Sequence, residues 1–230
     1  MAMLLATEAA ITVATSGRSV ALASQTTTAD SQPRLGPAEA DDEASAQLMA
    51  RLQDRRIEIL GARTEATTTW ANPDGTVTVE SFTGPIRVQD AAGKWRPVDV
   101  TLSEADGEIV PKAAAADIAF SAGGSAAPLA QVSRGEKSFG VAWDGALPKP
   151  VLKGNTATYP DAVPGGDVVV SALPEGFSHS VVLRERPSGP VEFRLPVKAE
   201  GLTLEETSDQ RLRWEDAKGK QVAAAPPPLM

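Results

Sequence analysis

The only histidine of the chain is the first residue to consider for chemistry, because histidine exchanges protons near neutral pH. His179 lies in the sequence Gly-Phe-Ser-His-Ser. A serine-hydrolase nucleophile turn requires Gly-x-Ser-x-Gly between a strand and a helix, whereas Ser180 holds the fifth position here and strand-forming residues follow. Alternation along that strand would place His179 on one face with Phe177, Val181 and Leu183. We therefore expect a half-buried packing histidine and no serine hydrolase.

The carboxylates offer one pair with suggestive spacing. Asp161 and Asp167 flank a loop rich in proline and glycine, residues 160–166. Facing one another, they could serve as a glycosidase pair or as calcium ligands. The alternative, which the loop composition favours, is that the first caps the turn and the second begins the next strand. The chain has no cysteine, which excludes a thiol nucleophile and a cysteine-based metal site. We predict no enzyme, no cofactor and no metal site.

The aromatic residues carry one binding hypothesis. The four tryptophans, five phenylalanines and one tyrosine all lie between Trp70 and Trp214. Trp95, Trp143 and Tyr159 fall near strand ends or turns, where a carbohydrate-binding module would display a platform for stacking against sugars. The other interpretation is that so few aromatics form the core, since each buries a large apolar area.

Charge and hydropathy exclude two classes of partner. The formal net charge is −8 and the isoelectric point is about 4.8. A nucleic-acid-binding surface needs clustered Lys and Arg, which this balance argues against. No run of about 18 uncharged apolar residues is long enough to span a bilayer.

The N-terminal residues are typical of an export signal that is degraded or begins at the wrong codon. In residues 1–23 the small-x-small sequence Ala21-Leu22-Ala23 precedes a polar stretch that begins at Ser24. Glu8 and Arg18 interrupt the apolar run, so an Ala/Thr-rich tail is the alternative. Residues 24–37 have the composition of a disordered linker.

A helix is predicted over 38–56. Acidic residues crowd its first turns and Arg51, Arg55 and Arg56 lie in its last, an order that suits the helix macrodipole. Its apolar stripe is thin and consists of Leu48, Met49 and Leu52. We interpret it as a solvated helix that leads into the next domain, with a partner-binding helix as the alternative.

Residues 57–225 are predicted to form a mainly β, antiparallel sandwich. Apolar and polar residues alternate at 98–102, 191–195 and 212–214, and the run 168–170 is apolar on both faces and therefore central. Phe193 and Leu195 are expected to pack on that central strand. Glycine-containing hairpin turns are expected at 72–75, 90–93, 104–107 and 216–219.

A weak internal repeat leaves two β modules open as an alternative. Residues 88–94 and 214–220 share an apolar-x-Asp-Ala-x-Gly-Lys pattern. Convergence on good turn chemistry accounts for it, but two related modules would split near 148–150. The Pro-rich residues 226–230 are interpreted as a truncated end.

Several of these segments also resemble a known family. The motifs WANPDGT at 70–76, GPIRV at 84–88 and GKWRPVD at 93–99, followed by residues 155–167 and 176–183, resemble the N-terminal region of large secreted actinobacterial proteins. In those modular wall-associated proteins the region precedes DNRLRE, LamG-like or RHS-repeat segments. The resemblance covers about 57–230, and the block that begins near Tyr159 is its most specific part. This chain departs from the family at His179-Ser180, where an acidic or Lys–Glu pair is common.

The resemblance implies a non-catalytic module of a secreted or cell-wall-associated protein, here the N-terminal piece of a longer product. Its partners would be downstream domains of the same polypeptide and cell-wall polysaccharide. No catalytic residues are carried over from the family. The alternative function is a carbohydrate-binding module, which would need Trp95 or Trp143 exposed on one face.

Overall fold

The structure, a computed structural model, describes residues 36–125 and 128–227. The expected signal peptide at 1–23, nearly all of the expected linker and most of the Pro-rich end lie outside the described residues. The described part is mainly β, with antiparallel sheets and one short α-helix, which confirms the predicted fold class. Within it, no helix combines the length and the apolar character that crossing a bilayer requires.

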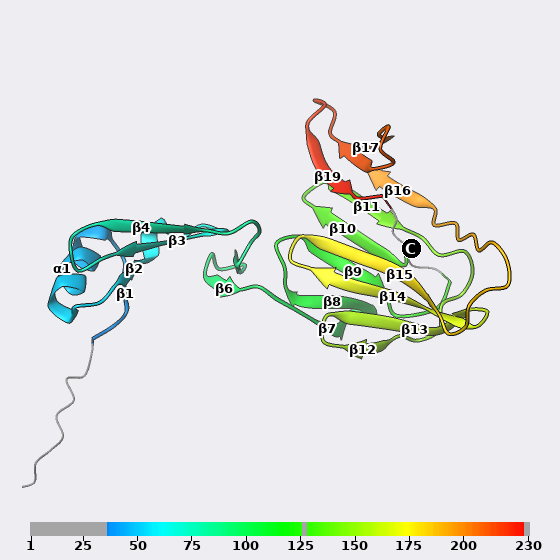
Figure 1. Ribbon diagram of the computed structural model, residues 1–230, viewed down its shortest axis with the longest axis horizontal. Coiled ribbons are helices and arrows are strands. Elements are labelled where there is room, and N and C mark those ends of the chain that lie inside the picture. Colours follow the sequence, from blue (N-terminus) through cyan, green and yellow to red (C-terminus); the bar gives the residue numbers. More distant parts are fainter. Residues whose placement is uncertain (1–35, 126–127, 228–230) are drawn as a thin grey trace, which may run out of the picture. The chain divides into compact units, whose positions relative to one another are not determined.

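The first sheet and the helix are built from residues 39–81 (Figure 1). The strand order is β1-β2-β3-β4, with β1 parallel to β2 and the other pairs antiparallel. The elements are β1 (Glu39–Ala40), α1 (Glu43–Gln53), β2 (Ile57–Ile59), the 3-10 helix η1 (Leu60–Ala62), β3 (Thr67–Ala71) and β4 (Val77–Ser81). Parallel strands need a crossover connection, and α1 supplies it.

The helix is shorter than the predicted range 38–56, with 11 residues. It begins after Asp42, whose side chain accepts a hydrogen bond from the Ser45 backbone N–H at 2.9 Å and caps the first turn. It ends at Asp54, whose φ of 50° lies in the left-handed region. Part of the acidic segment expected in the first helical turns is therefore the strand β1.

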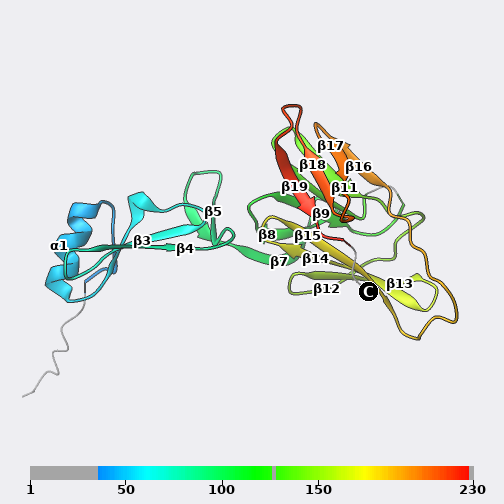
Figure 2. The same cartoon turned by 45° about the horizontal axis from the view of Figure 1, so that its top comes forward.

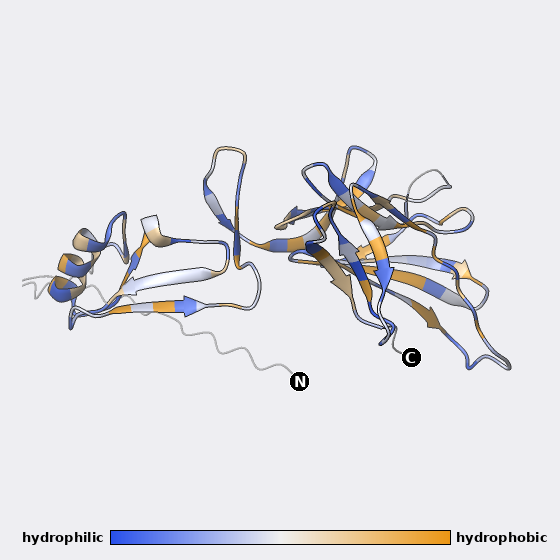
Figure 3. Ribbon diagram, turned by 90° about the horizontal axis from the view of Figure 1, so that it is seen from above, coloured by the Kyte–Doolittle hydropathy of each residue, from blue (hydrophilic) through white to orange (hydrophobic). Residues whose placement is uncertain are grey.

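The buried face of α1 also differs from the predicted stripe. Leu48 and Leu52 are 60% and 77% exposed, whereas Ala46 and Ala50 are fully buried. The alanines pack on a small core from β2 and β3 that consists of Ile57, Ile59 and Ala71, and Met49 of the predicted stripe, which is partly buried, packs against it too. Figure 3 shows hydrophilic and hydrophobic residues together on the helix. The helix is thus a packed part of this sheet and not a solvated lead-in, because the small alanine side chains let its backbone approach the strands closely.

The four predicted glycine turns all close hairpins, and their glycines have φ between 73° and 86°, where a side chain would be strained. The strands joined in this way are β3 to β4, β5 (Arg87–Gln89) to β6 (Trp95–Pro97), β7 (Asp99–Ala105) to β8 (Glu108–Ala113), and β18 (Leu212–Glu215) to β19 (Gln221–Ala225). β5 and β6 form a two-stranded sheet of their own.

The internal repeat corresponds to one turn geometry used twice. Oδ1 of Asp90 accepts hydrogen bonds from the backbone N–H groups two and four residues later, at 3.0 and 2.9 Å. Oδ1 of Asp216 does the same at 2.9 and 3.1 Å. In both turns an Asp at the first position and a Gly at the fourth are enough to produce this geometry. Turn chemistry therefore accounts for the shared pattern.

Two larger sheets face one another in a sandwich-like arrangement (Figure 1 and Figure 2). The six-stranded sheet has the order β16-β11-β10-β9-β8-β7, and the four-stranded sheet has the order β12-β13-β14-β15. Their remaining strands are β9 (Asp117–Ser121), β10 (Ala130–Arg134), β11 (Lys137–Val141), β12 (Val151–Lys153), β13 (Thr156–Val163), β14 (Gly166–Leu173), β15 (Gly176–Leu183) and β16 (Val197–Glu200). All pairs within both sheets are antiparallel.

One core fills the space between these sheets. Its largest fully buried side chains are Tyr159, Phe120, Ile109, Leu129, Val168 and Val170. The Tyr159 hydroxyl donates a hydrogen bond across the core to the Ser121 carbonyl at 2.7 Å. The core takes residues from both sides of 148–150, so the segments that a split there would separate share one hydrophobic interior.

Two packing predictions for this core have opposite outcomes. The run 168–170 belongs to β14, which lies between β13 and β15 and is central as predicted. The expected strand at 191–195 is absent, and Phe193 is 39% exposed, so its predicted burial on β14 is wrong. Pro190 and Pro196 flank this segment directly, and a proline has no backbone N–H to donate to a ladder. Leu195 does pack against the core.

The last sheet is three-stranded, with the order β17-β18-β19 and β17 spanning Thr203–Glu206. Its central strand contributes Trp214, which is 4% exposed. The indole stacks on Phe139 of β11, with ring centroids 4.5 Å apart. This contact attaches the C-terminal hairpin to the six-stranded sheet.

Candidate functional site

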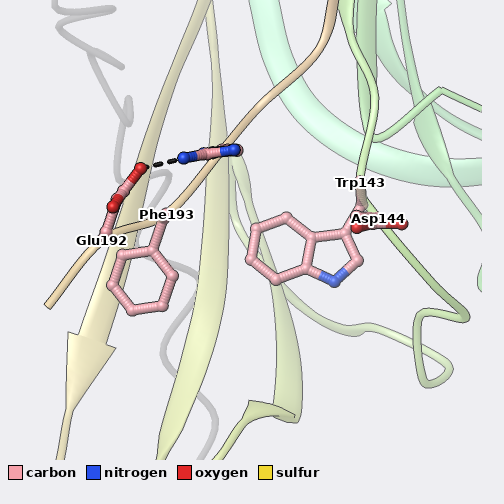
Figure 4. Close-up of a pocket in the computed structure, with 5 residues that line it drawn as sticks. Trp143, Asp144, Glu192 and Phe193 are labelled. Carbon is pink, nitrogen blue, oxygen red and sulfur yellow. Dashed lines mark hydrogen bonds and ion pairs between the residues drawn. The ribbon is translucent and has the colours of Figure 1, made fainter.

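A hollow of about 380 Å³ lies beside Trp143, one of the three predicted stacking residues. It is lined by Trp143, Asp144, Glu192, Phe193 and Arg194. Figure 4 shows Trp143 and Asp144 on one side of it and Glu192 and Phe193 on the other. An indole and a phenyl ring thus border one open space together with charged groups.

Strand pairing explains why these distant segments meet. Val141, at the end of β11, pairs with Val197, at the start of β16. The ladder continues for one more bond, from the Ala142 N–H to the Pro196 carbonyl at 2.8 Å. Trp143 follows directly, and the chain before Pro196 runs past it in the opposite direction. The indole is half-buried and packs on the main core, which fixes its position.

The charges of the hollow do not balance. Arg194 Nε donates to Glu192 Oε1 at 2.8 Å, and both side chains are well exposed. This pair cancels its own charge and contributes little to stability in water. The exposed Asp144 carboxylate forms no ion pair or hydrogen bond with another described side chain. The hollow therefore carries one uncompensated negative charge.

The other two predicted stacking residues do not join Trp143. Trp95 begins β6 in the separate two-stranded sheet and is half-buried. Tyr159 is fully buried in the main core, which contradicts its assignment to a sugar-stacking surface. Burial raises the pKa of its phenol above the ordinary value. Residue 159 lies on the inward face of β13, and which face points inward depends on sheet pairing that local sequence does not reveal.

Asp161 and Asp167 do come together, as the loop suggested, but with Arg184 between them. Arg184 Nη1 donates to Asp161 Oδ1 at 2.6 Å, and Nη2 donates to Asp167 Oδ1. The Asp161 backbone N–H also donates to Asp167 Oδ1 at 2.9 Å, made possible by a β-bulge where Asp161 has φ 55°.

This arrangement is unfavourable for acid–base catalysis. The Asp161 N–H, and after it Arg184, hold the pKa of Asp167 below its usual value. A general acid that works near neutral pH needs a raised pKa. Within the described residues, no group of three or more His, Cys, Asp or Glu side chains is placed to hold a metal ion.

His179 is exposed, so the prediction of a half-buried residue is wrong. It lies on β15, the edge strand of the four-stranded sheet, opposite Val170 in the register. Its ring lies 6.4 Å from that of Phe177, on the same strand face. Nearby protein atoms displace water from the imidazole and lower its pKa. An edge strand leaves one side of the ring open to solvent.

A buried charged network in the first sheet escaped the sequence reasoning. Glu58 of β2 is only 7% exposed and accepts two hydrogen bonds from Arg63, at 2.6 and 2.8 Å. Arg87 lies 3.7 Å from the same carboxylate and donates to Thr68 Oγ1 at 2.6 Å and to the Thr67 carbonyl at 2.7 Å. The Arg63 hydrogen bond is the main reason that the pKa of Glu58 is lowered. This network ties β5 to β3 and is structural.

Comparison with known proteins adds no relative. No family model matches the chain, and neither a curated protein nor a solved structure matches it.

Proposed function

We propose that this chain is a non-catalytic structural and interaction module of a secreted or cell-wall-associated modular protein. The observation that carries the proposal is Arg184, which bridges Asp161 and Asp167 through one guanidinium. The pair with the most suggestive catalytic spacing is thereby held in ion pairs and hydrogen bonds with one guanidinium. The resemblance to wall-associated actinobacterial proteins supplies the setting, with downstream domains of the same polypeptide and wall polysaccharide as partners.

A hydrolase screen with and without added divalent metal tests the absence of catalysis. The parent is compared with Asp161→Asn and Asp167→Asn, and we expect no turnover by any of them. Turnover by the parent that an aspartate variant loses, with both forms melting alike, would overturn the proposal.

Export is tested separately, in cells that carry the complete gene. We expect the product in the medium or the wall fraction, with a mature N-terminus at or near Ser24. Recovery of the product only in the cytosol, with the initial methionine intact, would contradict the localisation.

A carbohydrate-binding module is the second candidate, and the hollow beside Trp143 favours it. Aromatic rings present apolar faces to the C–H groups of sugars, while carboxylates accept hydrogen bonds from hydroxyls. A pull-down with insoluble polysaccharides tests this function. We expect retention of the parent chain and loss of retention by Trp143→Ala.

A further inference from the structure

We propose that the hollow beside Trp143 binds a neutral glycan, with one sugar ring against the indole and adjacent hydroxyls on the Asp144 carboxylate. This inference rests on the carbohydrate-binding function proposed above and names the class of ligand. Neither the resemblance nor the comparisons assign a ligand to these residues.

The aromatic walls supply a prepared surface for a sugar ring. The Trp143 indole packs on the core, and the backbone bond between Ala142 and Pro196 holds the opposite wall beside it. Phe193, 39% exposed, gives that wall an apolar surface. A side chain that is already fixed loses little conformational entropy when a ligand binds. The volume of about 380 Å³ lies within the range of small-molecule sites, about 300–1,000 Å³.

The charges select against acidic sugars. Arg194 is the only cation among the lining residues, and Glu192 already pairs with it at 2.8 Å. An acidic sugar would meet the uncompensated Asp144 and a chain with a net charge of −8. A neutral sugar avoids this repulsion and meets Asp144 and Arg194 with its hydroxyls. Neutral hydroxyls suit both groups, because a carboxylate accepts hydrogen bonds from them and a guanidinium donates to them.

The test is affinity gel electrophoresis of the whole chain in gels that contain one polysaccharide each. Neutral polymers are represented by β-glucan, xylan and mannan, and acidic ones by polygalacturonate. We expect at least one neutral polymer to retard the parent chain, with weak or no retardation by polygalacturonate.

Variants of the lining then locate the site. Trp143→Ala should weaken neutral binding roughly tenfold or more, and Phe193→Ala and Asp144→Asn by about threefold. Phe82→Ala is the matched control for Phe193→Ala. Phe82 is exposed to a similar extent, 44% against 39% for Phe193, and does not line the hollow. Phe193 and Asp144 are exposed, so their variants keep the test valid if Trp143→Ala fails to fold.

The outcomes separate this inference from the broader function. Equal or tighter binding of polygalacturonate would overturn the neutral assignment and leave carbohydrate binding standing. Neutral binding that survives all three lining substitutions would move the site elsewhere on the chain. Failure of every polymer to bind the parent would reject the carbohydrate-binding function itself.

Discussion

Lys137 Nζ lies 2.9 Å from Asp216 Oδ2, and this ion pair joins residues that are 79 positions apart in the chain. The same carboxylate uses Oδ1 to close the β18–β19 turn. Phe139, two residues after Lys137, stacks on Trp214, two residues before Asp216. One carboxylate therefore shapes a hairpin and attaches it to β11. The Lys137 hydrogen bond, with the turn N–H groups, lowers the pKa of Asp216 to about 2.

Asp216→Asn should lower the melting temperature at pH 7 and have progressively less effect in acid. A carboxyl group whose pKa is lowered by folding stabilises the protein above its unfolded pKa, near 3.8, and loses that contribution as the pH falls toward 2. The measurement is thermal unfolding of both forms between pH 7 and pH 2, where the two curves should converge. Asp90→Asn is the control, because Asp90 makes the same turn and, among the described residues, forms its ion pair with Arg96 of its own hairpin. If the two substitutions lower the melting temperature equally, the link to Lys137 contributes nothing.

Tyr159 should resist ionisation until the protein unfolds. It is the only tyrosine, so the ultraviolet absorbance of phenolate reports on it alone. Burial raises the pKa of its phenol, so the folded protein holds the phenolic proton more tightly than the unfolded chain does. This stabilises the fold at a pH below the ordinary phenol pKa of about 10, and the contribution is lost as the pH rises further. In an alkaline titration, phenolate absorbance should appear together with the loss of β circular dichroism. Phenolate that appears near pH 10 in a folded protein would show that the ring is accessible.

Tyr159→Phe should destabilise the fold by about 1–3 kcal/mol, because the Ser121 carbonyl then lacks its donor across the core. Urea unfolding at equilibrium provides the measurement. Thr158→Val, at the neighbouring outward-facing position of β13, is the control and should change the free energy of unfolding by no more than about 0.5 kcal/mol.

Removing the Glu58 carboxylate should be costly, since it leaves Arg63 and Arg87 without their shared buried partner. We expect Glu58→Ala to lose about 3 kcal/mol at pH 7. The lowered pKa means that the carboxylate stabilises the fold above its unfolded pKa, near 4.5, and that this contribution disappears as the pH falls further. Denaturant titrations at pH 7 and at low pH should show the gap between parent and variant closing. A variant as stable as the parent at pH 7 would contradict the network.

The two faces of α1 should respond in opposite ways to changes of size. Ala50→Leu would overpack a site with no exposed surface and should cost about 1–3 kcal/mol. Leu52→Ala removes a side chain that is 77% exposed and should change stability by at most about 0.5 kcal/mol. Chemical denaturation followed by circular dichroism compares the two. A larger loss from Leu52→Ala would restore the predicted leucine stripe as the buried face.

Local features of the chain were readable from the sequence alone. The turns that run from Asp to Gly at 90–93 and 216–219 and the central strand at 168–170 follow from residues close together in the chain. A turn depends on which residues accept a positive φ or bond to their own backbone, and strand alternation has a period of two. Both properties act over a few residues and need no knowledge of the partner strands.

Only the tertiary structure decided which side chains meet. The burial of Tyr159, the choice of alanines over leucines on α1, and the Arg184 bridge between Asp161 and Asp167 all depend on which strands pair and which face turns inward. Phe193 lies opposite Trp143 because β16 returns to pair with β11 after 55 intervening residues between Val141 and Val197. Such long-range pairing is governed by the total burial and hydrogen bonding of the whole fold. For that reason the hollow, and the charged residues that line it, could not be predicted from local sequence.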